Sequence, residues 1–343
     1  MRALVYTAVA TAPVVTDVQD PGCPADGVLI EVRATGVCRS DFHAWKGDDP
    51  VRLPHVGGHE LAGVIIEVGS QVDSWRPGDR VTVPFVCGCG RCVDCRAGSP
   101  QVCARQTQPG FTHWGSFAER VAIQAADFNL VRLPDDLDFV TAAALGCRFA
   151  TAYRAVTGHA STRPGDRLAV YGAGGAGLSA VMIGSALGLE VVAVDPSAAA
   201  RDRAADCGAT LTIDPRADDP VAKINNDLGG VQLSLDCAGT AITAVQSVRS
   251  LRRGGHHVQV GLLFGESATP PVPMDRVIAW ELSVHGSHGI AATDYPGLLE
   301  LVISGRVDPA RLIGEVTDLA GAGRALTAMA EPSTGAGITV AVP

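Results

Sequence analysis

Hydrophobic and polar positions alternate in short stretches over the first part of the chain, and glycine or proline turns separate these stretches. Residues 28–37, 61–69 and 79–86 read VLIEVRATGV, LAGVIIEVG and DRVTVPFV, a pattern typical of half-buried β-strands. We therefore expect a small β-barrel or folded sheet up to about residue 148.

From about residue 150, apolar strands alternate with helical segments. Residues 166–197 predict a strand, a glycine-rich loop, a helix and a second strand. Residues 241–254 (AITAVQSVRSLRRG) predict a helix, and residues 255–263 predict a buried strand after it. Regular alternation of strands and helices is typical of a parallel sheet, so we expect an α/β domain over residues 149–289.

The pattern changes again near residue 290. Residues 293–307 (TDYPGLLELVISGRV) predict an amphipathic helix, and residues 337–343 (GITVAVP) predict a final strand. We expect this segment to return to the first domain, which then consists of residues 1–148 and 290–343.

Charge and hydropathy argue against two classes of protein. The chain has 343 residues, 27 of them basic and 36 acidic, and we find no basic stripe of the kind that binds nucleic acid. No uninterrupted apolar run approaches the ~18 residues of a membrane span. Tyr6 and Thr7 interrupt the N-terminal apolar stretch, which reads as a pair of strands rather than a secretion signal. We expect a cytoplasmic protein.

Four of the ten cysteines lie close together in the sequence CGRCVDCRAGSPQVC. Cys89, Cys92, Cys95 and Cys103 follow the spacing C-x2-C-x2-C-x7-C, and four thiolates can surround one Zn²⁺ tetrahedrally. A closed shell of this kind leaves no position for substrate, so we expect a structural zinc. The alternatives are free thiols, a redox pair or a ribbon-type interaction module.

The glycine-rich loop predicts a dinucleotide site. Gly172, Gly174 and Gly177 have G-x-G-x-x-G spacing between a strand and a helix, and Gly175 lies among them. Asp195 ends the next strand, 18 residues after Gly177, near the ~20 expected for the carboxylate that binds the adenosine ribose. Glycines can also serve only a turn, but the context favours NAD, and a carboxylate favours NAD over NADP.

Cys38, His59 and Cys147 are candidates for a second metal site, although each alone has a simpler interpretation as a core residue. His59 follows two glycines in GGHE, and Cys147 lies where the second domain begins. Two thiolates and one imidazole would leave a fourth zinc position for water or a substrate oxygen. The spacing of these residues does not by itself establish the ligand set.

The chain resembles the zinc-dependent alcohol dehydrogenases of the medium-chain dehydrogenase/reductase superfamily, in particular the shorter yeast-type microbial enzymes. The matching segments are GVCRSDFHAWKG, PHVGGHELAGVIIEVG, the cysteine cluster, GFTHWGSFAERV, LGCRFATAY and GAGGAG. The resemblance implies a GroES-like, mainly-β catalytic domain plus a Rossmann doubly wound parallel sheet. It also implies two Zn²⁺ per chain, NAD, a small alcohol or carbonyl substrate, and a homo-oligomer in which a tetramer is favoured over a dimer.

The resemblance implies that Cys38, His59 and Cys147 bind the catalytic zinc. Asp41 would hold the other ring nitrogen of His59, as carboxylates commonly orient ligating histidines. Glu60 would lie behind the metal and could ligate it transiently.

Other residues of the same segment receive roles by resemblance. Arg39 would contact the coenzyme pyrophosphate, Ser40 would hydrogen-bond the alcohol oxygen, and His43 would complete a proton relay to water. Three aromatic residues would line the substrate pocket or, alternatively, pack in the core: Trp45, Phe85 and Trp114.

The chain departs from the family pattern at two positions. Ile338 stands where relatives usually have an arginine that touches the pyrophosphate. The lysine that often follows the ribose-binding acid is absent, and Arg201 or Arg203 could compensate.

Two other functions remain open within this resemblance. A polyol or sorbitol-type dehydrogenase commonly has an acidic residue in place of Cys147. A non-catalytic relative would be expected to lose zinc ligands or relay residues, all of which are present here.

Overall fold

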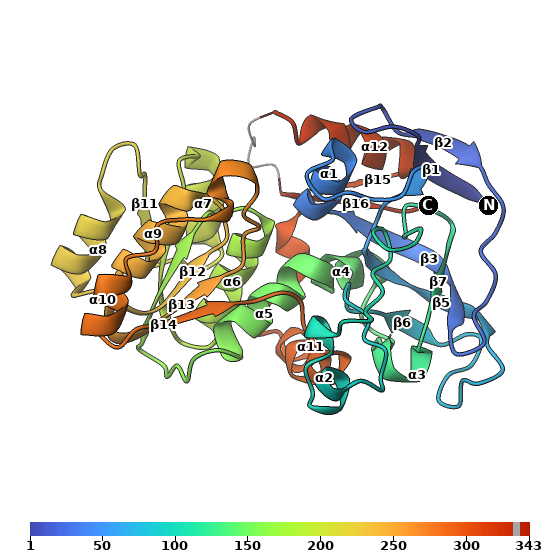
Figure 1. Cartoon of the computed structure of the whole chain (residues 1–343), viewed down its shortest axis with the longest axis horizontal. Helices are drawn as coiled ribbons and strands as arrows, with labels where there is room; N and C mark the ends of the chain where they lie inside the picture. The colour runs from blue at the N-terminus through green and yellow to red at the C-terminus, as the bar shows by residue number, and fades with distance from the viewer. Residues whose placement is uncertain (332–336) are drawn as a thin grey trace. The chain divides into compact units, whose positions relative to one another are not determined.

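The computed structural model describes residues 1–331 and 337–343 (Figure 1). These residues form two compact units. Unit 1 contains Met1–Ala150 and the described residues from Gly289 onwards, and unit 2 contains Thr151–His288. Unit 1 is mainly β-structure and unit 2 has a parallel sheet covered by helices, which confirms the predicted fold class.

Unit 1 contains one antiparallel sheet and one mixed sheet. In one, the order is β2-β1-β4, so the N-terminal strand pair forms as expected. In the other, the order is β15-β16-β3-β5-β6-β8, and β7 also pairs with β3. The strands are β1 (Arg2–Tyr6), β2 (Val14–Asp17), β3 (Val28–Val37), β4 (His55–Val56), β5 (Glu60–Val68), β6 (Arg80–Thr82), β7 (Arg120–Ile123), β8 (Val131–Arg132), β15 (Ile313–Thr317) and β16 (Ile338–Ala341).

The helices of unit 1 are short. They are α1 (Arg39–Lys46), α2 (Val93–Arg96), α3 (Ala126–Asn129), α4 (Phe139–Ala144), α11 (Tyr295–Ile303) and α12 (Leu319–Ala328). Strand β6 ends earlier than the sequence predicted, and Pro84, which has no N–H to donate to a ladder, follows shortly after its end. Ile338, at the start of β16, is only 5% exposed, so a buried aliphatic side chain occupies this position.

Unit 2 is built on a six-stranded parallel sheet with the order β11-β10-β9-β12-β13-β14. The chain runs outward from β9 to β11 and then returns to place β12 on the other side of β9. In such sheets ligands bind outside the carboxyl ends of the strands at this point of reversal. The strands are β9 (Arg167–Tyr171), β10 (Glu190–Val194), β11 (Leu211–Ile213), β12 (Val231–Asp236), β13 (Leu251–Gln259) and β14 (Ser283–Gly286).

Helix α5 precedes β9, and helices α6 to α10 connect consecutive strands of the sheet, as the alternating pattern predicted. They are α5 (Ala150–Thr157), α6 (Gly175–Ala186), α7 (Ala198–Asp206), α8 (Pro220–Leu228), α9 (Ala241–Arg249) and α10 (Met274–Ala279). None of the helices in the described part of the chain has the length and apolar character needed to cross a membrane.

The boundary between α9 and β13 differs from the expectation. The helix was expected to continue to residue 254, but it ends at Arg249 and β13 begins at Leu251. Leu251 is fully buried and pairs with Val231 of β12. Burial of this leucine in the sheet therefore outweighs the helical pattern of the residues that follow it.

Candidate metal centres and coenzyme site

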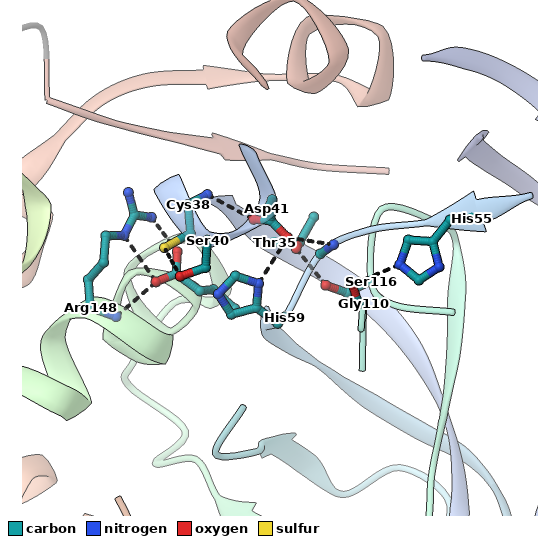
Figure 2. Close-up of polar contacts among 11 residues, drawn as sticks. Thr35, Cys38, Ser40, Asp41, His55, His59, Gly110, Ser116 and Arg148 are labelled. Atoms are coloured by element: carbon teal, nitrogen blue, oxygen red, sulfur yellow. Dashed lines mark hydrogen bonds and ion pairs between the residues drawn. The ribbon is translucent and has the colours of Figure 1, made fainter. Parts of the chain in front are cut away.

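Cys38 lies at the junction of β3 and α1, where the short helix starts. Its backbone N–H donates to Oδ2 of Asp41 over 2.9 Å, so Asp41 caps the helix from inside its first turn. The other carboxylate oxygen, Oδ1, accepts hydrogen bonds of 2.9 Å from the backbone of Gly58 and from Nδ1 of His59 (Figure 2). One carboxylate thus fixes both Cys38 and His59.

His59 directs its remaining ring nitrogen into the candidate metal centre. Nε2 of His59 is buried and has no hydrogen-bond partner among the described residues. One ligand atom from each of Cys38, His59, Glu60 and Cys147 lies within 4.8 Å of all the others. Two sulfurs and an unpartnered imidazole nitrogen are suitable zinc ligands, so the residues present fit a Zn²⁺ ion.

Cys147 reaches this cluster from a turn of π-helix, Leu145–Phe149, that joins α4 to α5. Gly146 has a non-helical ψ of −130° within this turn. A Cβ at Gly146 would lie 2.6 Å from Cβ of Glu60, so only glycine allows this approach of the turn to β5. Such π-helical turns occur frequently at functional sites.

Glu60 is engaged by Arg148 rather than free to turn toward a metal. Its Oε1 accepts hydrogen bonds of 3.0 Å from the backbone N–H and from Nε of Arg148, and Nη2 donates to Oε2 (Figure 2). Both side chains are buried, so the ion pair is largely shielded from solvent. The charge of Arg148 lowers the thiol pKa of Cys38, whereas at Cys147 the charge of Glu60 opposes that of Arg148.

Electrostatic interactions within this cluster favour the thiolate at Cys38 and oppose it at Cys147. Interaction with Cys147, the largest cause, and the charges of Arg148 and His59 lower the pKa of the Cys38 thiol despite burial. Burial opposes a charge on His59, but Asp41 outweighs it and raises the pKa of His59. A thiolate is the form of cysteine that binds metal ions.

The cysteine cluster forms a second candidate centre in unit 1. One sulfur from each of its four cysteines lies within 4.8 Å of the others, and Sγ of Cys92 is 3.6 Å from that of Cys103. Backbone N–H groups, first that of Arg91, lower the pKa of Cys89 to about 6. Four thiolates in this arrangement fit a zinc ion without an open position. Two groups of possible metal ligands are found among the described residues. One is the cysteine cluster, and the other, the Cys38 cluster, consists of Cys38, His59, Glu60 and Cys147.

The glycine-rich loop in unit 2 joins β9 to α6. A Cβ at Gly177 would lie 1.8 Å from the carbonyl oxygen of Gly172, so the close contact between loop and helix requires glycine there. A Cβ at Gly174 would meet nothing within 4 Å, which leaves open space above the helix start. The loop therefore fits the backbone of a dinucleotide, which binds at such a helix N-terminus.

Asp195 follows β10 and faces this loop. Its Oδ2 accepts a hydrogen bond of 2.8 Å from the backbone of Ala173, and its Oδ1 accepts one of 2.8 Å from Ser197. The carboxylate is thus held at the carboxyl end of the sheet, where a ribose is bound in dinucleotide folds.

The predicted relay residues lie on α1 with different partners. The Cys38 thiol is 3.8 Å from Oγ of Ser40, which places the hydroxyl at the candidate metal centre (Figure 2). Nδ1 of His43 is 2.9 Å from Oδ2 of Asp48. Arg39 donates to the carbonyl of Met329 in unit 1, so its predicted contact with a pyrophosphate stays a prediction.

The three predicted pocket aromatics occupy different environments. The ring of Phe85 lies 5.8 Å from that of His59. Trp45 is buried in a core cluster of unit 1 and donates from Nε1 to the carbonyl of Thr11 over 2.6 Å. Trp114 packs partly buried against the same cluster and donates to Pro54. Trp45 and Trp114 therefore pack with the core of unit 1, one of the two environments expected for them, and their role in a substrate pocket stays a prediction.

Sequence reasoning missed two residues beside the metal cluster. The ring of Phe111 lies 5.2 Å from that of His59. Arg148 pairs with Glu60 and follows Cys147 directly in the sequence. An arginine in an otherwise apolar segment next to a candidate ligand could have indicated this role, whereas nothing in the sequence distinguishes Phe111.

Comparisons with known proteins cover both units. Residues 24–135 match the alcohol dehydrogenase GroES-like domain, and residues 175–304 match the zinc-binding dehydrogenase domain. An alcohol dehydrogenase of Geobacillus stearothermophilus is 35% identical over 312 residues, 90% of this chain and 90% of that protein.

Solved structures show the same similarity. The alcohol dehydrogenase TADH from Thermus sp. ATN1 has a TM-score of 0.92 at 29% identity, covering 100% of this chain and 99% of that one. A zinc-binding dehydrogenase from Sinorhizobium meliloti 1021, solved with NADP bound, has a TM-score of 0.89 at 29% identity over 100% and 99% of the two chains.

Proposed function

Because this chain belongs to the zinc-dependent alcohol dehydrogenases of the medium-chain dehydrogenase/reductase superfamily, we propose that it transfers hydride reversibly between alcohols and NAD. Primary or secondary alcohols would be oxidised to aldehydes or ketones. The observation that supports this most is the cluster of Cys38, His59 and Cys147, with the unpartnered Nε2 of His59 in its centre.

The Cys38 cluster would hold the catalytic zinc, and the cysteine cluster would hold a structural zinc. Zinc in a site with an open position acts as a Lewis acid toward an alcohol or carbonyl oxygen. Asp41 keeps Nδ1 of His59 protonated and leaves Nε2 as the ligand atom. The pairing of Glu60 with Arg148 keeps a second carboxylate near the site without leaving its charge unpaired.

Ser40 and His43 would carry the proton that the alcohol loses. The Ser40 hydroxyl can accept this proton and donate its own, because it lies next to Cys38 at the site. His43 can pass this proton on, and Nδ1 of its ring lies 2.9 Å from Oδ2 of Asp48. The proton would leave to water from this end of α1.

Unit 2 would bind NAD at the glycine-rich loop. Gly172, Gly174, Gly175 and Gly177 would receive the pyrophosphate, and Asp195 would accept hydrogen bonds from the adenosine ribose. A carboxylate at this position repels a 2′-phosphate, so we favour NAD over NADP, although one structural relative was solved with NADP.

The two alternatives have less support. A polyol dehydrogenase commonly has an acidic residue at position 147, and here a cysteine completes the cluster. A non-catalytic relative is disfavoured because Ser40 and His43 accompany the ligands. By likeness to the family, we also propose a cytoplasmic tetramer.

Metal removal from the wild-type protein tests this function. We expect NAD-linked turnover on a panel of uncharged alcohols and carbonyls, loss of turnover after treatment with a zinc chelator, and recovery after zinc is added back. We expect loss of turnover because the catalytic zinc would keep an open coordination position at which a small chelator can bind. Turnover that survives removal of all zinc would contradict the proposal, and no turnover by fully zinc-loaded protein would favour the non-catalytic relative.

A further inference from the structure

Two arginines share one carboxylate beside the candidate ribose site of unit 2. Asp214 follows β11, the strand next to β10 in the sheet. Its Oδ2 lies 3.1 Å from Nη2 of Arg201 and 3.0 Å from Nη2 of Arg216, and its Oδ1 lies 3.1 Å from Nε of Arg216. The Arg216 pair is therefore bidentate, which fixes the plane of the guanidinium.

The same arginines are bound to the backbone around Asp195. Arg201 donates from Nη1 to the carbonyl of Asp195 over 2.7 Å, and Arg216 donates from Nη2 to the carbonyl of Pro196. Both positive groups are thus held within one residue of the carboxylate that would bind the ribose.

Arg216 is the more accessible of the two. Its side chain is 67% exposed, whereas those of Arg201 and Asp214 are 17% and 20% exposed. Its Nη1 has no hydrogen bond to any residue within 1–331 or 337–343. The hydrogen bonds from Arg216 lower the pKa of Asp214 to about 2, so this anchor is charged at every pH at which the protein would work.

The arrangement joins two features that usually occur separately. A carboxylate after the second strand selects NAD, whereas an arginine nearby accommodates the 2′-phosphate of NADP. Here Asp195 and Asp214 carry two negative charges and Arg201 and Arg216 carry two positive charges, so the group is formally neutral. The carboxylate of Asp195 would repel a 2′-phosphate. The ordered guanidinium of Arg216 would attract it and could donate a hydrogen bond to it from Nη1.

Building on the proposed function, we propose that Arg216, held by Asp214, binds the 2′-phosphate of NADP and keeps NADP as a second, weaker coenzyme of this chain. Asp195 then sets the preference for NAD, and Arg216 limits how strong that preference becomes. Arg201, which is more buried and bound to the Asp195 carbonyl, stabilises the strand end on which both depend.

The test is a fluorescence titration of the zinc-loaded protein with NADH and with NADPH. We expect Arg216→Gln to weaken NADPH binding by roughly 10- to 100-fold, the range for loss of charge-assisted hydrogen bonds, and to change NADH binding by less than about twofold. Arg216→Lys should recover part of the NADPH affinity. Lys223→Gln, which removes an equal charge from an exposed ion pair on α8, is the matched control and should change neither.

Asp195→Asn provides the reciprocal experiment. This variant should bind NADPH at least about tenfold more tightly than wild type, because it removes the like charge, and adding Arg216→Gln to it should abolish that gain. Equal NADPH affinity with and without Arg216 would overturn the inference while leaving the proposed function intact. Equal weakening of both coenzymes by Arg216→Gln would also overturn it, since that indicates a structural role. A wild-type protein that binds neither coenzyme would overturn the proposed function as well.

Discussion

Asp41 accepts three hydrogen bonds, from the backbone of Cys38 and Gly58 and from the ring of His59. It is buried, and its hydrogen bonds fix the positions of two candidate metal ligands, Cys38 and His59. Its loss would release the start of α1 and also allow the imidazole of His59 to rotate or change tautomer.

Asp41→Asn is therefore expected to weaken zinc at the Cys38 cluster by roughly 10- to 100-fold, as for other partners of ligating histidines. The measurement is competition for zinc with a chelator of known affinity. Glu119→Gln, which breaks a partly exposed ion pair with Arg2, is the control and should leave zinc affinity unchanged. Wild-type zinc affinity in folded Asp41→Asn would show that Asp41 does not position His59.

Individual residues differed in how well the sequence predicted them. The spacing of the four clustered cysteines is local, so a metal site could be predicted from it directly. Cys38, His59 and Cys147 are far apart in the sequence, and only the resemblance grouped them. Trp45 packs in a core cluster, one of the two environments expected for it, because aromatic side chains suit both and sequence alone does not separate them.

At the scale of elements, three histidines from different parts of unit 2 lie together. His285 of β14 has its ring 5.8 Å from that of His256 on β13 and 5.3 Å from that of His159, which follows α5. Each ring has a buried nitrogen with no hydrogen-bond partner among the described residues. Burial and then the charges of Arg154 and His285 lower the pKa of His159 to about 4, and burial lowers that of His256.

This packing of buried histidines predicts that the free energy of unfolding decreases as the pH falls. A histidine whose pKa is lower in the folded state binds fewer protons than the unfolded chain does, so its contribution is complete above about pH 6.5 and declines as pH falls toward about 4. His159→Gln should therefore lose less of its urea midpoint between about pH 7 and pH 5 than wild type does. Zinc release at low pH affects both proteins alike, and equal losses would contradict the prediction.

Strands and helices with a regular hydrophobic period were predicted well from the sequence, but the residues at which they begin and end were predicted poorly. Within β3, Glu31 and Arg33 are less buried than the apolar residues on either side of them, as the alternation of these positions predicted. The start of β13 was missed because its first residues, LRRGG, lack an apolar alternation, and pairing with β12 decides their conformation. The π-helical turn that carries Cys147 depends on the contact of Gly146 with Glu60, a long-range contact that no local pattern records.

At the scale of the whole molecule, the change of period near residue 150 allowed the fold class to be predicted. A mainly-β unit and a parallel α/β unit have different hydrophobic periods, and these are visible along the chain. The candidate metal ligands all belong to unit 1, and the glycine-rich loop and Asp195 belong to unit 2. In the proposed function, unit 1 would hold the metal ions and unit 2 would bind the coenzyme.

The most direct test of this account is the zinc content per chain of Cys38→Ser, determined together with its NAD-linked turnover. We predict two zinc ions in the wild-type chain, one in the folded variant, and no turnover by the variant, because a serine hydroxyl does not replace a thiolate ligand. Cys23→Ser, at a cysteine outside both clusters, should keep two zinc ions and full turnover. Two zinc ions in Cys38→Ser, or turnover with only one, would contradict the assignment of the catalytic metal to Cys38, His59 and Cys147.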